Sequence, residues 1–528
     1  MGRIARYLNQ LTVGNVFDAP EILEAYSTDR SALKIKPKYV ALPETTDDIR
    51  KIMRFCYQLA SRNLKIPIAV RGSGLDELGG DLTNGLVIST EKLNRLLESD
   101  KRERLVRVQA GITLKELNTA LSINGLTIPI GGHEMETIGG LISNCPSDDY
   151  SAKYGGIYNY VERIEVVLPN GDILQTSRQS KHAIAKRKKD KRFESEIYRK
   201  LSKLARGNSE LVKQIRKETS GLAGYPNVAR SERKGSIDLM PLFFGAEGTL
   251  GVITEVILRA VPIRKTPKRV VATFEDFMMA QKFLEYVKSL KPREQNIYDI
   301  DIIRTAEETG KRLSDITRKM DRGFVVYATF DEKSNSCLRK VASVRKLLPK
   351  TSQLIIESPK TATALNEFDN SLISFLNCAR SGERIPILTD FYVPAKNMLR
   401  FMDDLKVIES SLKLDLALFG SYSASNYSLR PKFNLDDKDY RKKAIAFLRT
   451  GAFVIQRQGG SLTGGSPEGY LKAIVTNADF AEAEYELYLQ IKAIFDKYNM
   501  LNPTAKLGAT PQFTISHLRT TSSAKIMV

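Results

Sequence analysis

Four glycine-bearing segments constrain the fold of this 528-residue chain more than any other feature. In chain order they are residues 70–75 (VRGSGL), 137–144 (TIGGLISN), 154–156 (YGG) and 245–254 (GAEGTLGVIT). Closely spaced glycines let successive backbone N–H groups point into one concavity, a geometry that binds phosphate. Paired glycines followed by small polar residues also let a flat ring lie against the backbone. Each segment alone is typical of a tight turn, but the four in this order predict one ligand site.

The first segment disfavours two common nucleotide folds. Gly74 is followed by Leu75 and Asp76, not by Lys and Ser or Thr, so the segment is not the phosphate loop of nucleoside triphosphatases. It does not open a helix with the spacing G-x-G-x-x-G either, which disfavours a nicotinamide dinucleotide fold.

Short apolar runs alternate with helical patterns along the first half of the chain, and this order predicts an α+β fold. Residues 46–60 follow good helix-capping chemistry and place Ile49, Ile52 and Cys56 on one helical face. Residues 169–172 (PNGD) predict a hairpin between two strands. Further strands are expected at 39–42, 66–70, 86–89, 105–109 and within 243–262, and a helix is expected to stop at Gly125.

Histidine and cysteine are scarce, which excludes several kinds of cofactor site. The chain has three histidines (His133, His182, His517) and four scattered cysteines without a C-x-x-C pair. This pattern argues against a zinc ribbon, a redox dithiol or an iron–sulfur cluster. No metal site is expected.

Positive charge is concentrated in one segment. The formal net charge is +20, from 81 Lys and Arg against 61 Asp and Glu, and residues 178–217 carry 15 basic against 4 acidic residues, a net of +11. This basic stretch predicts either a patch for peripheral contact with anionic membrane or an acidic partner, or simply a solvated helical insertion. Aromatic residues are sparse in it, so no specific nucleic-acid partner is expected.

Domain boundaries follow from these patterns. We expect an N-terminal lead (1–36), a first domain (37–262) interrupted by the basic insertion, a second domain (263–509) after a Pro- and Lys-rich joint, and a flexible tail (510–528). No signal peptide, myristoylation motif or spanning apolar stretch is recognised. The expected location is therefore cytoplasmic, possibly peripheral on the inner membrane face.

With these motifs the chain resembles the FAD-binding superfamily of vanillyl-alcohol oxidase and p-cresol methylhydroxylase (PCMH type), and within it the D-lactate dehydrogenase and glycolate oxidase subunit branch. The resemblance covers about residues 37–507 and implies a two-lobed FAD-binding domain followed by a C-terminal α+β substrate (cap) domain. It implies that residues 71–75 cradle the FAD pyrophosphate and that residues 129–144 line the flavin. The full set of residues implied to bind FAD is Arg71, Gly72, Ser73, Gly74, Leu75, Pro129, Thr137, Gly139, Gly140, Ser143, Asn144, Gly155, Glu247, Gly248, Gly251, Ile253 and Asn502.

The resemblance also implies noncovalent FAD. Leu75 stands where covalent relatives have a histidine, and residues 129–136 lack the cysteine of bicovalent relatives. His133 is the one histidine placed near the expected ring, where a surface or capping role is an equal alternative.

The C-terminal motifs of the branch have lost their metal-binding and basic residues. The histidines of the first motif are replaced by Ser421 and Ser428, and the glutamate and histidine of the second by Gly465 and Ser466. Ser and Gly cannot replace an imidazole as a metal ligand and proton acceptor. The remaining candidates are Tyr422 as a hydrogen-bond donor or a base with a lowered pKa, Asn426 facing the substrate, and Arg457 binding a carboxylate.

The expected function is therefore oxidation of an organic (2-hydroxy) acid or alcohol by hydride transfer to FAD. The electron acceptor, a quinone, a protein or oxygen, stays open. Two alternatives remain: a non-redox flavin-dependent transferase like alkylglycerone-phosphate synthase, and a non-catalytic FAD-binding protein.

Overall fold

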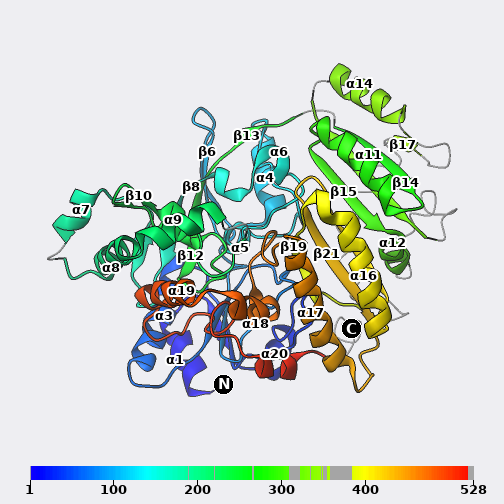
Figure 1. Ribbon diagram of the computed structural model, residues 1–528. Helices are drawn as coiled ribbons and strands as arrows, with labels where there is room; N and C mark the ends of the chain where they lie inside the picture. Colours follow the sequence, from blue (N-terminus) through cyan, green and yellow to red (C-terminus); the bar gives the residue numbers. More distant parts are fainter. Residues whose placement is uncertain are drawn as a thin grey trace.

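The chain consists of an N-terminal half with two sheets and a C-terminal half with one large sheet (Figure 1). The computed structural model describes residues 2–187, 190–218, 221–264, 267–307, 322–332, 334–346, 348, 354–356 and 383–520. Among the described helices, none combines the length and apolar character needed to cross a bilayer.

The first sheet carries the glycine loop at the end of one of its strands. Its order is β1–β2–β4–β3, with β2, β4 and β3 parallel and β1 antiparallel at the edge. The strands are β1 (Asn15–Phe17), β2 (Tyr39–Leu42), β4 (Leu86–Ser89) and β3 (Ile68–Arg71). Thus β1, from the N-terminal lead, is an integral edge strand of this half.

The second sheet is antiparallel and lies beside the first. Its order is β5 (Leu96–Asp100), β6 (Leu105–Gln109), β12 (Val252–Arg259), β8 (Val161–Val167) and β9 (Ile173–Gln175). β8 and β9 form the hairpin predicted from residues 169–172. The expected strand in 243–262 is β12, followed by β13 (Val261–Pro262), which pairs with β7 (Leu126–Thr127), whereas residues 240–243 form a 3-10 turn.

Helix ends in this half obey local capping rules. In α3 (Thr46–Ala60), Thr45 and Asp48 form a capping box, and the predicted apolar face is buried. α4 (Leu114–Ser122) begins at a second capping box, and Gly125, three residues after its end, has φ +69°. The other helices of this half are α1 (Arg3–Leu11), α2 (Pro20–Ala25), α5 (Ile138–Asn144), α6 (Ser151–Tyr154) and α10 (Val228–Ser231).

The C-terminal half is built on an antiparallel sheet covered by helices. Its strands are β17 (Leu354–Ile356), β14 (Lys268–Phe274), β16 (Phe324–Phe330), β15 (Glu294–Asp299), β20 (Leu416–Ser421), β21 (Asn426–Phe433) and β18 (Glu383–Arg384), with β19 (Leu388–Tyr392) also pairing with β21. The helices are α11 (Phe277–Ser289), α12 (Ile300–Glu307), α14 (Ser334–Arg345), α16 (Met398–Leu412), α17 (Tyr440–Arg457), α18 (Gly469–Asp479), α19 (Glu482–Phe495) and α20 (Pro511–His517). Of these, α11 and α14 contact β14, and α17 contacts β19.

The basic stretch 178–217 forms three helices at one edge of the molecule (Figure 1): α7 (Lys181–Lys186), α8 (Phe193–Gly207) and α9 (Ser209–Glu218). It is more than a solvated insertion, because Ile197, Tyr198 and Leu201 of α8 are buried in the core of the N-terminal half. Lys188 and Lys189, within the basic stretch, lie outside the described residues.

The expected flexible tail is wrong for residues 511–519. Residues 511–517 form α20, and Leu518 and Arg519 are buried, with Arg519 N donating to Ala32 O at 3.0 Å. A pattern rich in Ser and Thr looked like a tail because the contact that orders it comes from the opposite end of the chain. Residues 521–528 lie outside the described part.

Candidate functional site

A cavity of about 340 Å³ lies between the two halves, within the size range of ligand sites in proteins. One wall consists of the glycine loop after β3, the start of α5 and the segment before β12. The other consists of β15, β16, β19 and the β20–β21 hairpin. Sequence-predicted residues that line it are Gly72, Ser73, Gly74, Leu75, Thr137, Gly139, Gly140, Ser143, Asn144, Glu247, Gly248, Gly251, Ile253 and Asn426.

The glycine loop offers backbone donors to this cavity. The N–H groups of Ser73, Gly74 and Leu75 have no acceptor among the described residues, and Gly74 has φ +70°. Gly72 is needed for close approach, because a Cβ there would lie 2.3 Å from Thr137 Oγ1. The loop therefore forms a concave set of free N–H groups pressed against the start of α5, which is the geometry of an anion cradle.

The start of α5 is the second part of this cradle. Thr137 caps the helix by accepting a hydrogen bond from Gly140 N at 3.2 Å. Gly139 approaches the neighbouring chain closely: its N donates to Ala110 O at 2.7 Å, and a Cβ on it would lie 2.9 Å from Ala110 Cβ. Glycine at this position therefore lets the first turn of α5 lie directly against the chain at Ala110.

Arg71 lies at a second, adjacent cavity of about 310 Å³ that shares Gly72, Ser73 and Thr137 with the first. Its guanidinium donates to Thr28 O at 2.9 Å, lies 3.8 Å from Asp81 and is stacked 5.2 Å above the ring of Tyr26. Arg71 thus stabilises the glycine loop from the side of the second cavity. The glycine loop separates two hollows, an arrangement suited to an elongated ligand.

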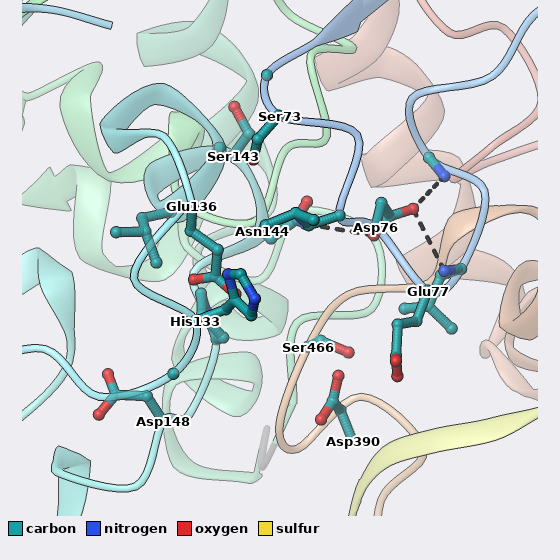
Figure 2. A pocket seen from close by; sticks show the side chains of 18 of the residues that line it. Ser73, Asp76, Glu77, His133, Glu136, Ser143, Asn144, Asp148, Asp390 and Ser466 are labelled. Atoms are coloured by element: carbon teal, nitrogen blue, oxygen red, sulfur yellow. Dashed lines mark hydrogen bonds between the residues drawn. The ribbon is translucent and has the colours of Figure 1, made fainter. Parts of the chain in front are cut away.

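Asp76 and Asn144 connect the loop to the end of α5, as the dashed lines in Figure 2 show. Asn144 Nδ2 donates to Asp76 Oδ1 at 3.3 Å, and the other oxygen of Asp76 accepts from Leu78 N and Gly80 N. Burial, reinforced by the nearby Asp81 carboxylate, raises the pKa of Asp76 to about 7. This carboxyl group is committed to holding the loop.

Glu247 and Asn502 connect the same wall to the C-terminal end of the chain. Glu247 accepts from Gly469 N at 2.7 Å and lies 3.4 Å from Lys506 Nζ, and burial raises its pKa to about 7. Asn502 Nδ2 donates to Glu247 O at 2.9 Å and also to Gly80 O. Asn502 does not line the cavity; it holds two lining segments together.

The hairpin β20–β21 forms the centre of the opposite wall. Gly420, Ser421, Asn426 and Ser428 line the cavity. Asn426 Nδ2 donates to Ser147 O at 2.8 Å across the cavity wall, while its buried Oδ1 has no partner. The structure thus places Asn426 where the sequence predicted it.

Besides Arg71 and Asn502, four predicted residues do not line the cavity: Pro129, Gly155, Arg457 and Tyr422. Pro129 and Gly155 do not line the cavity, and Gly155 ends α6 with φ +76° against Asn159. Arg457 is half exposed at the end of α17 and pairs with Asp404, so a role in binding substrate is not supported.

Tyr422 also does not line the cavity and cannot be the proposed base. It is buried beside Lys288 of α11, and burial raises the pKa of its hydroxyl above the ordinary value. Ser421, the last residue of β20, lines the cavity, whereas Tyr422 begins the turn after the strand and packs beside Lys288 of α11.

Several cavity residues were missed from sequence: Arg30, Asp76, Glu136, Asp148 and Asp390. Arg30 comes from the N-terminal lead and approaches His133 Nε2 at 3.3 Å, and both residues line the cavity. His133 is half-buried, and its Nδ1 accepts from Met135 N at 3.2 Å, which is a local capping contact. Asp390 had a signal, because it is a charged residue inside the otherwise apolar run 385–393. Within the described residues, no group of three or more His, Cys, Asp or Glu is arranged to hold a metal ion.

These features fit FAD. The free N–H groups at Ser73, Gly74 and Leu75 match a pyrophosphate, and the bare surface at Gly139 and Gly140 accommodates a flat ring. The second hollow beyond the loop provides the length that a dinucleotide needs.

Comparison with known families agrees with this fit. Residues 37–177 match the family described as the FAD binding domain, and residues 264–505 match the C-terminal domain of FAD linked oxidases. The glycolate oxidase subunit GlcD of Bacillus subtilis is 26% identical over 481 residues, 88% of each chain. A D-lactate dehydrogenase of Anaerostipes hadrus is 22% identical, with 92% of each chain covered.

A D-2-hydroxyglutarate dehydrogenase of Pseudomonas putida is 24% identical over 90% of this chain but only 49% of its own length. This chain therefore spans about half of that relative. Among solved structures, p-cresol methylhydroxylase with bound substrate is similar at a TM-score of 0.65 and 12% identity, covering 96% of both chains. An alkyldihydroxyacetonephosphate synthase is similar at 0.63 and 16%, covering 94% of this chain and 84% of that one.

FAD is accordingly the cofactor of this chain. The chain is an FAD-linked oxidoreductase: it combines the FAD binding domain with the C-terminal domain of FAD linked oxidases, is similar in sequence to glycolate oxidase and D-lactate dehydrogenase, and shares the fold of p-cresol methylhydroxylase.

Proposed function

We propose that this chain oxidises a small 2-hydroxy acid, or a chemically related alcohol, with noncovalently bound FAD. The observation that carries the proposal is one cavity in which the glycine loop and α5 face the β20–β21 hairpin. The relatives named above, glycolate oxidase and D-lactate dehydrogenase, support the substrate class.

Different residues of the cavity would have different roles in binding FAD. Bound FAD would supply a two-electron oxidant that takes a hydride from the carbon bearing the hydroxyl group. Ser73, Gly74 and Leu75 would hold the pyrophosphate by backbone N–H groups, and Gly139 and Gly140 would lie against the ring. Leu75, an apolar side chain at the loop, offers no atom for a covalent link.

The substrate would lie against the hairpin. Asn426 Oδ1 is buried without a partner, and an unsatisfied buried acceptor is costly unless a ligand supplies a donor. A donor group of the bound substrate would supply one. Ser421 and Ser428 add hydroxyl groups that can donate to a carboxylate.

The test is anaerobic reduction of the purified, FAD-loaded protein. D-lactate, glycolate and D-2-hydroxyglutarate are added separately while the flavin absorption is followed. Bleaching by at least one supports the proposal, and bleaching by none contradicts it. Reoxidation by quinone, oxygen or a protein acceptor then identifies where the electrons leave. A flavin that stays oxidised with every donor favours a non-redox transferase or a non-catalytic protein.

We also propose that the basic helices contact an anionic membrane surface. The outer side of α7–α9 carries exposed lysines that form no ion pair within the described part of the chain: Lys181, Lys186, Lys191, Lys203 and Lys217. Each lysine near an anionic bilayer contributes about 1 kcal/mol of attraction. Contact there leaves the cavity free, because none of these residues lines it.

Vesicle sedimentation tests this surface. Wild-type protein should bind vesicles containing phosphatidylserine, and binding should fall as salt is raised. The variant Lys191→Glu/Lys203→Glu should bind at least about 30-fold more weakly, from about 1 kcal/mol per lysine lost. Lys438→Glu/Lys497→Glu carries the same charge change at exposed sites elsewhere and serves as the control. Equal weakening by both pairs contradicts a localised contact.

A further inference from the structure

We propose that Asp390 is the catalytic proton acceptor, the group that takes the hydroxyl proton of the substrate. The inference rests on the proposed function and goes beyond it by naming the base. Asp390 lies on β19 and lines the cavity from the C-terminal half. Figure 2 shows its side chain directed into the cavity, on the same wall as Ser466 and across from Asn144 and His133.

The backbone at Asp390 is held in an unusual conformation that gives the side chain this direction. β19 is irregular between Leu388 and Phe391, where its register with β21 shifts, and Asp390 has φ +53°. A left-handed conformation costs energy for a residue other than glycine and persists only where the surroundings enforce it. Two hydrogen bonds do so: Asp390 N donates to Ser428 Oγ at 3.2 Å, and Gly465 N donates to Asp390 O at 3.0 Å.

The carboxylate itself is only weakly engaged. Its one hydrogen bond comes from Asn426 Nδ2 at 3.4 Å, close to the limit for such a bond. A carboxylate has room for about four such bonds. Asp390 therefore keeps lone pairs free to accept a hydrogen bond from a donor in the cavity.

A buried lysine lies behind this wall. Lys472 is fully buried and donates to Thr389 O at 3.1 Å, to Leu462 O at 2.9 Å and to Ser466 Oγ at 3.0 Å. Burial lowers the pKa of Lys472 to about 8. Among the nearby charges that oppose this lowering, Asp390 has the largest effect. Lys472 thus places a buried cation directly behind the wall that carries Asp390.

The other groups on this wall are poorer proton acceptors. Among the described lining residues of the C-terminal half, Asp390 is the only carboxylate. Ser421, Ser428 and Ser466 carry neutral hydroxyls. The hydroxyl groups of Tyr298 and Tyr327 are hydrogen-bonded to each other at 3.0 Å.

The carboxyl groups on the opposite wall are also poorly suited. Asp76 is occupied by backbone N–H groups of its own loop. Burial raises the pKa of Glu136 to about 8, so this group holds its proton at neutral pH. Asp390 is thus the carboxylate of the C-terminal wall that keeps lone pairs open to the cavity.

The reaction balances with Asp390 as base. The O–H bond of the substrate breaks and its proton moves to a carboxylate oxygen of Asp390. The C–H bond breaks, its hydrogen and electron pair leave as hydride to the oxidised flavin, and the carbon–oxygen double bond forms. Asp390 then releases its proton to solvent.

Asp390→Asn tests the inference, because Asn has the same shape and tolerates a left-handed backbone. The FAD-loaded variant is reduced anaerobically with D-lactate, glycolate and D-2-hydroxyglutarate. It is reduced in parallel with 1-benzyl-1,4-dihydronicotinamide, a hydride donor with no hydroxyl proton to remove. Asp403→Asn, the same change on an exposed side chain of α16, is the control. The visible flavin spectrum reports whether FAD is bound in the same environment.

We expect Asp390→Asn to slow reduction by hydroxy acids about 10²- to 10⁴-fold, the range of general base catalysis. Reduction by the dihydronicotinamide and the flavin spectrum should stay close to wild type. If Asp390→Asn is reduced by hydroxy acids at the wild-type rate, the inference about Asp390 is overturned while the proposed function stands. If reduction by both kinds of donor slows equally, the inference is also overturned, because equal slowing indicates a distorted cavity. If wild type is reduced by no hydroxy acid, the proposed function falls with it. Asp390→Gly, which also suits this φ, is the second variant, and loss of FAD from both would assign Asp390 a structural role.

Discussion

Replacing Gly72 with alanine is a direct test of the FAD cradle. The added Cβ would lie 2.3 Å from Thr137 Oγ1, closer than side-chain carbons approach other atoms in folded proteins. Gly72 does not have a positive φ, so alanine adds no backbone strain and the contact with Thr137 is isolated. Either Thr137 must rotate or the loop must move away from α5.

Both responses damage the cavity. Rotation of Thr137 removes the hydrogen bond that caps α5, at a cost of about 1 kcal/mol. Displacement of the loop is an overpacking defect worth about 1–3 kcal/mol. Because loop and helix both line the FAD cavity, we expect FAD affinity to fall by roughly 5- to 150-fold, which corresponds to about 1–3 kcal/mol.

The assay is fluorescence titration of flavin-free protein with FAD, together with urea unfolding. Gly207→Ala is the matched control, because nothing lies within 4 Å of its added Cβ and alanine favours the end of α8. In a Thr137→Ala background the clashing oxygen is gone, so Gly72→Ala should cost little more than the control. Unchanged FAD affinity in Gly72→Ala, or the same loss in both backgrounds, would refute the reasoning.

Three further outcomes are expected. Arg457→Ala should leave flavin reduction unchanged and cost under about 1 kcal/mol in urea unfolding, because it loses a half-exposed ion pair; slower reduction would restore its role as a substrate ligand. Lys492→Met should destabilise the protein by about 3–5 kcal/mol, since it leaves the buried Asp496 carboxylate without its cation, 2.7 Å away; a loss below about 1 kcal/mol contradicts this. Burial raises the pKa of Glu136 to about 8, above its ordinary value of 4.5, so the folded state holds a proton that the unfolded chain releases. Stability of the flavin-free protein should therefore fall between about pH 5 and pH 8, and Glu136→Gln should flatten this fall; equal pH dependence in both proteins would show that Glu136 does not cause it.

Much of the FAD wall was predictable because it depends on local sequence. Glycines at 72, 74, 139 and 140 allow a tight loop and a bare helix start whatever surrounds them, and capping residues such as Thr45 mark helix ends within four positions. Residues 71–75 were nevertheless treated as one group. Arg71 faces away from Gly72 and Ser73, because its partners Thr28 and Asp81 lie behind the loop.

The substrate wall was predicted less well. Ser421 and Asn426 face the cavity and Tyr422 does not, and only the register of β20 with β21 decides which side each takes. Arg457 looked like a carboxylate ligand because its distance from the cavity cannot be read from its neighbours in sequence. Asp390 was overlooked because it follows no motif.

By itself, the sequence predicted the α+β architecture from short-range strand and helix patterns, and it indicated the cofactor through the family resemblance that its glycine segments carry. Only the tertiary structure decided which charges meet in the cavity. Arg30, Glu136 and Asp390 are far apart in the chain, and their roles depend on desolvation and on partners from other segments. Burial raises the pKa of Glu136, and a strand irregularity directs the side chain of Asp390 into the cavity. Both effects exist only once distant strands have paired.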